Sequence, residues 1–155
     1  MIYIDLDGVL ADFDGWLVDF LGIGYTETEV QDLIQAKASE CFLKSKVIES
    51  NKYLLSLGEF RILTALPKLS LYKDSVFMKL KRNKLKWCEM LGIPKSKVIM
   101  VGRPSEKVLY CEPGDILYDD YEKTVDAWNS AGGIGFLVEA KKHSSKYYTK
   151  DGIKL

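Results

Sequence analysis

Two acidic residues, Asp5 and Asp7, lie at the end of the first apolar run of the chain, residues 2–6. Because residues i and i+2 of an extended chain share a face, the two carboxylates are expected to point the same way. Gly8 then allows a sharp turn of the backbone. One carboxylate of such a pair can bind a hard cation and attack an electrophile, while the other moves a proton. Turn formation or helix capping is the alternative interpretation of the pair taken alone.

A second acidic pair, Asp119 and Asp120, follows the apolar run at residues 115–118. If both runs are parallel strands, their carboxyl ends lie at the same edge of the sheet, where such folds bind ligands. Carboxylates that converge there repel each other unless a cation is present. Mg²⁺ prefers oxygen ligands and phosphate substrates, so the sequence predicts a magnesium site. One residue of the pair could also cap the helix that is expected to follow.

Two further residues fit chemistry on a phosphate. Thr64 and Ala65 end the run at residues 60–66 and offer a hydroxyl and backbone N–H groups to phosphate oxygens. Lys107 follows the run at residues 97–101, and its charge could offset a phosphoryl group and the carboxylate that attacks it. Taken alone, Lys107 would be a surface lysine and Thr64 an ordinary residue at the end of a strand.

Five short apolar runs provide the strands that would position these residues. The runs lack strict alternation, which is typical of a parallel sheet covered on both faces. They are residues 2–6, 60–66, 97–101, 115–118 and 133–138. Helical patterns occupy residues 72–91 and 122–131, and Thr26 with Glu29 forms a capping-box pattern. This alternation predicts an α/β fold with a parallel sheet of about five strands and helices on both faces.

The connection between the first two runs is longer than a simple crossover. It spans about 50 residues, against about 30 for a whole βαβ unit. We expect the excess, at about residues 14–57, to form a small helical cap inserted after the first strand. The whole chain, residues 1–155, is expected to form one domain. The tail after Val138 is polar and rich in lysine, and we expect it to be loosely packed.

The composition is that of an ordinary globular protein. Apolar residues make up 47% of the chain and charged residues 28%, which argues against disorder. Lys plus Arg and Asp plus Glu both number 22, so no net charge attracts nucleic acid or an anionic membrane. No apolar run reaches the ~18 residues of a membrane span, and no signal-peptide pattern is found. Three cysteines without a CxxC pair favour reduced thiols and a cytoplasmic protein.

Several other side chains allow two interpretations. A basic run lies on the predicted helix at residues 72–91. A solvated outer face is the favoured interpretation of this run, and a patch that attracts phosphate or nucleic acid is the alternative. It consists of Lys79, Lys81, Arg82, Lys84 and Lys86. Trp16, Phe20 and Tyr25 could line a base pocket or pack inside the insert, and His143 is assigned no role.

The order of these motifs resembles that of the haloacid dehalogenase superfamily. The resemblance covers residues 2–120 and consists of Asp5-x-Asp7-Gly8-Val9, Thr64, Lys107 and Asp119-Asp120. Within that superfamily, the strings DLDGVLADF and ILTA-x-P most resemble the 5'(3')-deoxyribonucleotidases. Those are magnesium-dependent phosphatases of nucleoside monophosphates. The resemblance implies a Rossmann-like sheet, a nucleotide as the small-molecule partner and nucleotide metabolism as the role.

The resemblance also assigns catalytic roles. Asp5 would be the nucleophile that takes the phosphoryl group as an aspartyl-phosphate. Asp7 would protonate the leaving alkoxide and later activate water. Thr64 and the backbone of Ala65 would hold phosphate oxygens, and Lys107 would stabilise the pair formed by Asp5 and the phosphate.

The metal and the base are assigned in the same way. Mg²⁺ would be held by Asp5, the Asp7 carbonyl and Asp119, with support from Asp120. Phe13 matches an aromatic residue that stacks on the base in this family.

Two positions depart from the family and leave the substrate open. Leu66 and Tyr121 stand where the family often has arginine. Another small phosphomonoester, or the 3'-phosphate end of a polynucleotide, is therefore an alternative substrate. A non-catalytic phospho-acceptor, such as a receiver domain, is the alternative from another class. Receiver domains place the acidic pair first in the chain and lack the acid–base group that Asp7 would supply here.

Overall fold

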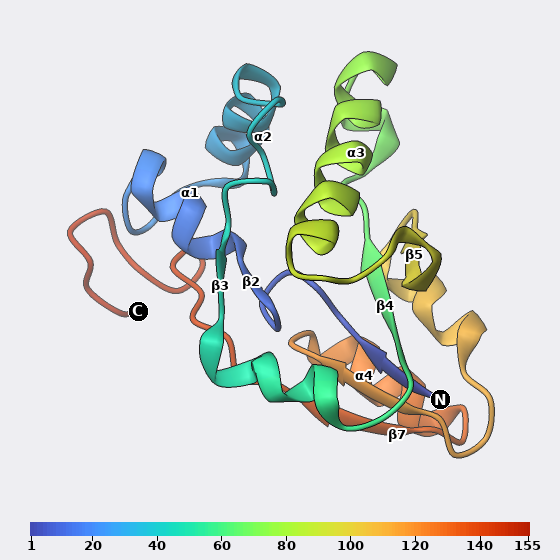
Figure 1. Cartoon of the computed structure of the whole chain (residues 1–155). Helices are drawn as coiled ribbons and strands as arrows, with labels where there is room; N and C mark the ends of the chain where they lie inside the picture. Colours follow the sequence, from blue (N-terminus) through green and yellow to red (C-terminus); the bar gives the residue numbers. More distant parts are fainter.

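Five parallel strands form a single sheet (Figure 1). The computed structural model describes residues 1–155, apart from the side chain of Leu69. The strands lie in the order β5-β4-β1-β6-β7, and each neighbouring pair is parallel. Their bounds are β1 Ile2–Ile4, β4 Phe60–Ala65, β5 Val98–Val101, β6 Ile116–Asp119 and β7 Ile134–Leu137. Every predicted run contributes a strand, so the expected α/β fold with a Rossmann-like sheet is confirmed.

The central strand, β1, leads directly into the first acidic pair. Ile4 is in register with Ile62 of β4 and with Tyr118 of β6. The next residues along these strands, Asp5 and Asp119, therefore leave the sheet at the same edge.

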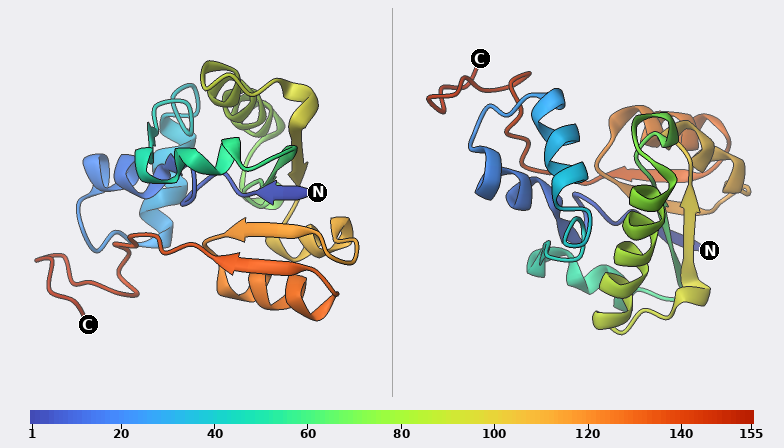
Figure 2. Two further views of the ribbon diagram at one scale, coloured as in Figure 1. Left: turned by 60° about the horizontal axis from the view of Figure 1, so that its bottom comes forward. Right: turned by 90° about the horizontal axis from the view of Figure 1, so that it is seen from above.

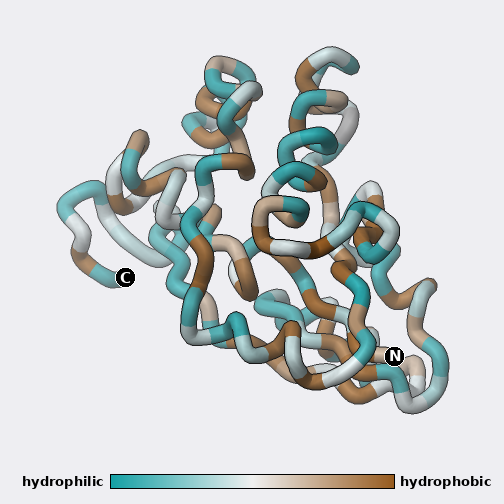
Figure 3. The backbone as a smooth tube through the Cα atoms, viewed as in Figure 1, coloured by the Kyte–Doolittle hydropathy of each residue, from teal (hydrophilic) through white to brown (hydrophobic). Residues whose placement is uncertain are grey.

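Helices cover both faces of the sheet, and successive strand residues face opposite sides. The α-helices are α1 Phe13–Leu21, α2 Glu27–Ala36, α3 Asp74–Met90 and α4 Glu122–Ser130. On one face, Trp87 of α3 belongs to the buried cluster that contains Ile4. On the other face, Trp128 of α4 packs edge-on against Tyr3. Figure 3 shows polar and apolar residues alternating along α3, as expected for a helix with one buried side. Among the described helices, none is long and apolar enough to cross a membrane.

An insert after β1 carries more than helices. It contains α1, α2, a two-stranded antiparallel ribbon and a 3₁₀ helix. The ribbon joins β2 (Ala11–Asp12) to β3 (Lys46–Val47), and the 3₁₀ helix is η1 (Glu49–Ser56). The predicted capping box at the start of α2 is present, with the Glu29 N–H donating to Thr26 Oγ1 at 3.2 Å. The other 3₁₀ helices are η2 Leu69–Leu71, η3 Lys95–Lys97 and η4 Pro104–Tyr110.

The insert is fastened to α3 by buried polar contacts. Asn83 Nδ2 donates to the carbonyl oxygens of Ala38 at 2.7 Å and Cys41 at 3.0 Å. Trp87 Nε1 donates to the Ser45 carbonyl at 2.8 Å. Each bond satisfies a carbonyl that would otherwise be buried without a partner, so α3 fixes where the insert lies over the sheet edge.

The C-terminal tail runs beside the insert (Figure 2). The Gly24 N–H donates to the His143 carbonyl at 2.6 Å, and the Ser145 N–H donates to the Tyr25 carbonyl at 2.7 Å. These bonds anchor the tail at His143 and Ser145, while none of residues 139–155 is buried, which agrees with the expected loose packing. The polar tail still folds back because its backbone bonds the loop between α1 and α2, a contact that the side-chain pattern does not encode.

Replacing Asn83 by alanine should loosen the insert. The change removes both donors and leaves two buried carbonyls unsatisfied, so the free energy of unfolding should fall by about 2 kcal/mol. Denaturant unfolding measures the effect. Arg82→Ala, at the exposed neighbouring position, is the control. A loss no larger than that of the control would contradict the proposed anchoring.

Candidate active site

Lys107 joins the two strands that end in acidic residues. Its Nζ lies 2.9 Å from Asp5 Oδ1 and 2.7 Å from Asp119 Oδ2. All three side chains are buried, and Lys107 is only 2% exposed. The short helix η4 brings Lys107 across the end of β4 and β5 to this position. The structure therefore brings together three of the residues that the motif pattern singled out.

The charged form of Lys107 is strongly favoured. Burial by itself disfavours an ammonium, but the adjacent carboxylates Asp5 and Asp119 outweigh this effect and raise the pKa of Lys107. Backbone N–H groups hold the same carboxylates in place. The Leu6 N–H donates to Asp5 Oδ1 at 2.8 Å, and the Tyr121 N–H donates to Asp119 Oδ1 at 2.9 Å.

Asp120 completes a group of three carboxylates. One oxygen each of Asp5, Asp119 and Asp120 lie within 4.8 Å of one another. Gly8 makes this approach possible, because a Cβ at that position would lie 2.2 Å from Asp120 Oδ2. Gly8 also has φ = +85°, which glycine adopts most readily.

Asp7 lies beside this group and has a different partner. Its Oδ2 accepts a hydrogen bond from Lys84 Nζ at 2.6 Å. Among the described side chains, none bonds the other oxygen, Oδ1. Burial raises the pKa of Asp7, and the charge of Lys84 opposes that rise. This environment favours a carboxyl group that can hold a proton.

The solvated-face interpretation of the basic run is wrong for Lys84. Its side chain is 0% exposed, whereas Lys79, Arg82 and Lys86 are exposed as predicted. The sequence contained a signal for this burial. Lys84 lies four residues from both Leu80 and Cys88, in the middle of the apolar stripe of α3.

Thr64 and Ala65 meet the same lysine. Lys84 Nζ donates to Thr64 Oγ1 at 2.9 Å and to the Ala65 carbonyl at 2.9 Å. The hydroxyl proton of Thr64 remains available for a phosphate oxygen. The next backbone N–H along the chain, that of Leu66, donates to the Val101 carbonyl at 2.8 Å and is therefore not free for a phosphate.

The four carboxylates leave the site negatively charged. We call Asp5, Asp7, Asp119 and Asp120 the acidic edge. It faces two buried ammonium groups, Lys84 and Lys107, and the more exposed Lys142, so one negative charge is left over when all seven groups are ionised. Burial and repulsion from Asp5 raise the pKa of Asp119 to about 6 and that of Asp120 to about 8. An all-oxygen donor set with this excess charge fits a hard divalent cation such as Mg²⁺.

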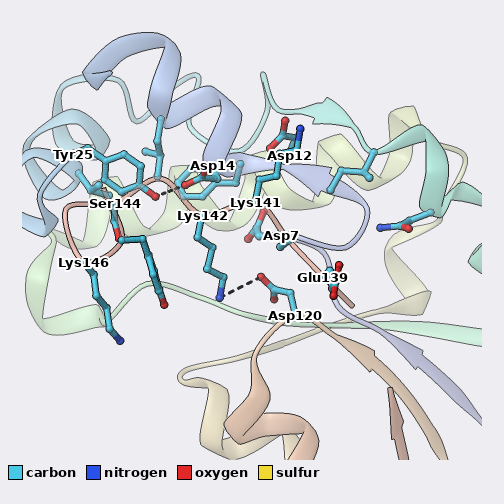
Figure 4. Close-up of a pocket in the computed structure, with 18 of the residues that line it drawn as sticks. Asp7, Asp12, Asp14, Tyr25, Asp120, Glu139, Lys141, Lys142, Ser144 and Lys146 are labelled. Carbon is cyan, nitrogen blue, oxygen red and sulfur yellow. Dashed lines mark hydrogen bonds and ion pairs between the residues drawn. The ribbon is translucent and has the colours of Figure 1, made fainter. Parts of the chain in front are cut away.

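A pocket of about 840 Å³ opens onto the acidic edge (Figure 4). The acidic edge contributes Asp7 and Asp120 to its lining, next to Gly8. Asp5, Thr64 and Lys107 lie deeper, since each is under 7% exposed. A substrate would therefore enter past Asp7 and Asp120 to reach them.

The insert and the tail form the outer walls of this pocket. Phe13 and Tyr25 line it from the insert, and the hydroxyl of Tyr25 donates to Asp14. Trp16 is instead buried behind Phe13, in a stacked contact with it, and Phe20 is exposed away from the lining. Of the three aromatic residues with the base-pocket alternative, only Tyr25 lines the pocket. Phe13, which the resemblance matches to a base-stacking residue, lines it as well.

Residues of the tail were missed by the sequence analysis. Lys141, Lys142, Lys146 and Tyr147 line the pocket, and Lys142 Nζ lies 3.9 Å from Asp120 Oδ2. His143, which was given no role, lies 4.0 Å from Asp14 through Nε2. No local pattern in the sequence marks the tail as part of a site, because its position follows from bonds to a loop over 100 residues away.

Comparisons with known proteins add a distant likeness. The chain matches no protein-family model and no curated protein. Two solved structures of the HAD domain of the effector protein Lem4 from Legionella pneumophila are similar to it. One is 18% identical, covers 90% of this chain and 85% of the other, and has a TM-score of 0.40. The other, an inactive mutant, is 16% identical over 90% and 84% of the two chains, with the same TM-score. Function must therefore be argued from the site itself.

The metal-free protein should lose stability as the pH rises from about 4 to about 8. In the unfolded protein the pKa of an aspartate is near 3.9, and in the folded protein the pKa values of Asp119 and Asp120 are higher. The folded protein therefore binds more protons than the unfolded protein in this pH range, and its stability decreases as the pH rises. In the presence of a metal chelator, the melting temperature of the wild-type protein should decrease more across this pH range than that of Asp120→Asn. Mg²⁺ should raise the melting temperature of wild type at pH 8, and that of Asp120→Asn less. Asp126→Asn, exposed on α4, is the matched control. An unchanged pH slope in Asp120→Asn would contradict the assignment.

Proposed function

We propose that the chain is a magnesium-dependent phosphomonoesterase that forms an aspartyl-phosphate on Asp5. The observation that supports this most strongly is the Lys107 bridge between Asp5 and Asp119. It places a positive charge beside a carboxylate that would attack a phosphorus atom. Asp7, two residues away, has a separate partner and a raised pKa. Two acids in such different surroundings fit a nucleophile and an acid–base group.

The reaction would proceed in two balanced steps. An oxygen of Asp5 attacks the phosphorus, the bond to the leaving oxygen breaks, and protonated Asp7 gives that oxygen its proton. A water molecule then attacks the phosphorus of the aspartyl-phosphate while ionised Asp7 takes its proton. Inorganic phosphate leaves, Asp5 is free again and Asp7 is again protonated. Each carboxyl group thus returns to its starting state.

The remaining residues would stabilise charge. Mg²⁺, held by Asp5, Asp119 and Asp120 with the Asp7 carbonyl, would neutralise phosphoryl oxygens. Lys107 would offset the charge that builds up between Asp5 and the phosphoryl group. The free hydroxyl proton of Thr64 would bind a phosphoryl oxygen, as would the backbone at Ala65.

Nucleoside monophosphates, 5'(3')-deoxyribonucleotides in particular, are the substrates we propose. The pocket volume of about 840 Å³ is within the usual range for small-molecule sites. Aromatic rings of Phe13, Tyr25 and Tyr147 are available to a base on its walls. The strings DLDGVLADF and ILTA-x-P support the same class. We further propose a reducing, cytoplasmic setting, which three free cysteines fit.

Phosphate release from a panel of monophosphates tests this function. The panel contains dUMP, dTMP, dGMP, AMP, a 3'-nucleotide, a sugar phosphate and a 3'-phosphorylated oligonucleotide, with and without Mg²⁺. We expect magnesium-dependent release that favours the deoxynucleotides and disappears in Asp5→Asn. Release from only the sugar phosphate or the oligonucleotide would support the phosphatase mechanism and contradict the proposed nucleotide substrate. No release from any member would favour a binding module.

Asp7→Asn separates an enzyme from a phospho-acceptor. Loss of the proton donor should lower kcat about 10²–10⁴-fold, the usual contribution of general acid–base catalysis. Mg²⁺ affinity, measured by calorimetry, should stay nearly unchanged, because the three clustered carboxylates are retained. Full activity of this variant would show that the assigned mechanism is wrong.

A further inference from the structure

The ammonium group of Lys84 is enclosed at the centre of the site, although the motif pattern gives it no role. Its side chain is fully buried on α3, and Nζ has three protein acceptors. An ammonium has three N–H donors, so Asp7 Oδ2, Thr64 Oγ1 and the Ala65 carbonyl use all of them. Lys84 is therefore held in one geometry and has no donor left for a phosphate.

Two of these contacts fix Lys84 to the sheet. Thr64 and Ala65 are the last residues of β4, which pairs with β1. The third contact reaches Asp7, which lies in the loop that leaves β1. Lys84 thus ties the side chain of a loop residue to the rigid end of the neighbouring strand.

The insert closes the remaining side of the ammonium. The ring of Phe42 lies 4.4 Å from Nζ, in a cation–π contact. Phe42 is the one non-glycine residue with positive φ, +66°, among the residues whose backbone is described. A bulky residue in this region is uncommon, and here the conformation places its ring against Lys84. Lys84 is thereby shielded from solvent, whereas the side chain of Asp7 remains 25% exposed and lines the pocket.

We propose that Lys84 is a positioning residue that holds Asp7 for proton transfer, an inference that rests on the proposed function. Lys84 binds Oδ2, and the other oxygen, Oδ1, is buried without a partner among the described residues. This one contact therefore sets the orientation of the carboxyl group that would exchange a proton with the leaving group or with water. An apolar residue at position 84 would complete the buried stripe of α3 between Leu80 and Cys88. Packing alone therefore does not explain why a charged residue is buried there. The contact fixes where the carboxyl group of Asp7 points.

Two phosphomonoesters of similar size test this role. Benzyl phosphate releases an alkoxide that needs a proton, whereas p-nitrophenyl phosphate releases a phenolate that does not. Lys84→Met should lower kcat/KM for benzyl phosphate about 100-fold or more, and for p-nitrophenyl phosphate less than about fivefold. Lys86→Met, an exposed position on the same helix, should change neither. Equal losses on both esters, or no loss, would overturn the proposal while the phosphatase function stands. Inactivity of wild type on every ester would overturn both.

A double variant covers the case in which Lys84→Met does not fold. Asp7→Asn/Lys84→Met removes both buried charges and leaves a neutral pair. If Lys84 acts through Asp7, adding Lys84→Met to Asp7→Asn should change kcat/KM for benzyl phosphate by less than about threefold, because coupled residues are not additive. A further loss of about 100-fold would show that Lys84 acts elsewhere, and would overturn the proposal.

Discussion

Repulsion among carboxylates at one sheet edge is the constraint on which the rest of the site depends. β1 and β6 are neighbours in register, so their acidic residues cannot separate without disrupting the sheet. Two buried lysines offset part of the charge, and each comes from a different element. Lys107 arrives on η4 and Lys84 on α3. Burial and then repulsion from Asp5 raise the pKa values of Asp119 and Asp120, and a divalent cation bound there would relieve this repulsion.

The two lysines divide the acidic edge into two units with different properties. Lys107 shares its charge between Asp5 and Asp119, which are both almost fully buried and held by backbone N–H groups. This arrangement favours the ionised form of both carboxyl groups. Lys84 contacts a single carboxylate, Asp7, one oxygen of which has no partner among the described side chains. That unit suits a group that changes its protonation state. Separate counter-ions therefore allow two aspartates that are two residues apart to act differently.

The same contacts connect the chemistry to the walls of the pocket. α3 supplies Lys84 to the site, and one residue earlier it supplies Asn83 to the insert. The insert in turn places Phe42 against Lys84 and Phe13 in the pocket lining. The walls of the pocket are thus attached to the helix that supplies the counter-ion of Asp7, the acid–base residue that we propose.

The five strands, the main helices, the acidic pairs and the need for glycine at position 8 can all be predicted from the amino-acid sequence. These features are local, because an apolar run, an i, i+2 spacing or a capping box is read within a few residues. The burial of Lys84, whose partner Asp7 lies 77 residues away, and the use of the tail as a pocket wall depend on the three-dimensional fold. A charged residue in a basic run has the same sequence whether it faces water or a carboxylate. Which one it meets depends on the element that packs over it, and that is a property of the whole fold.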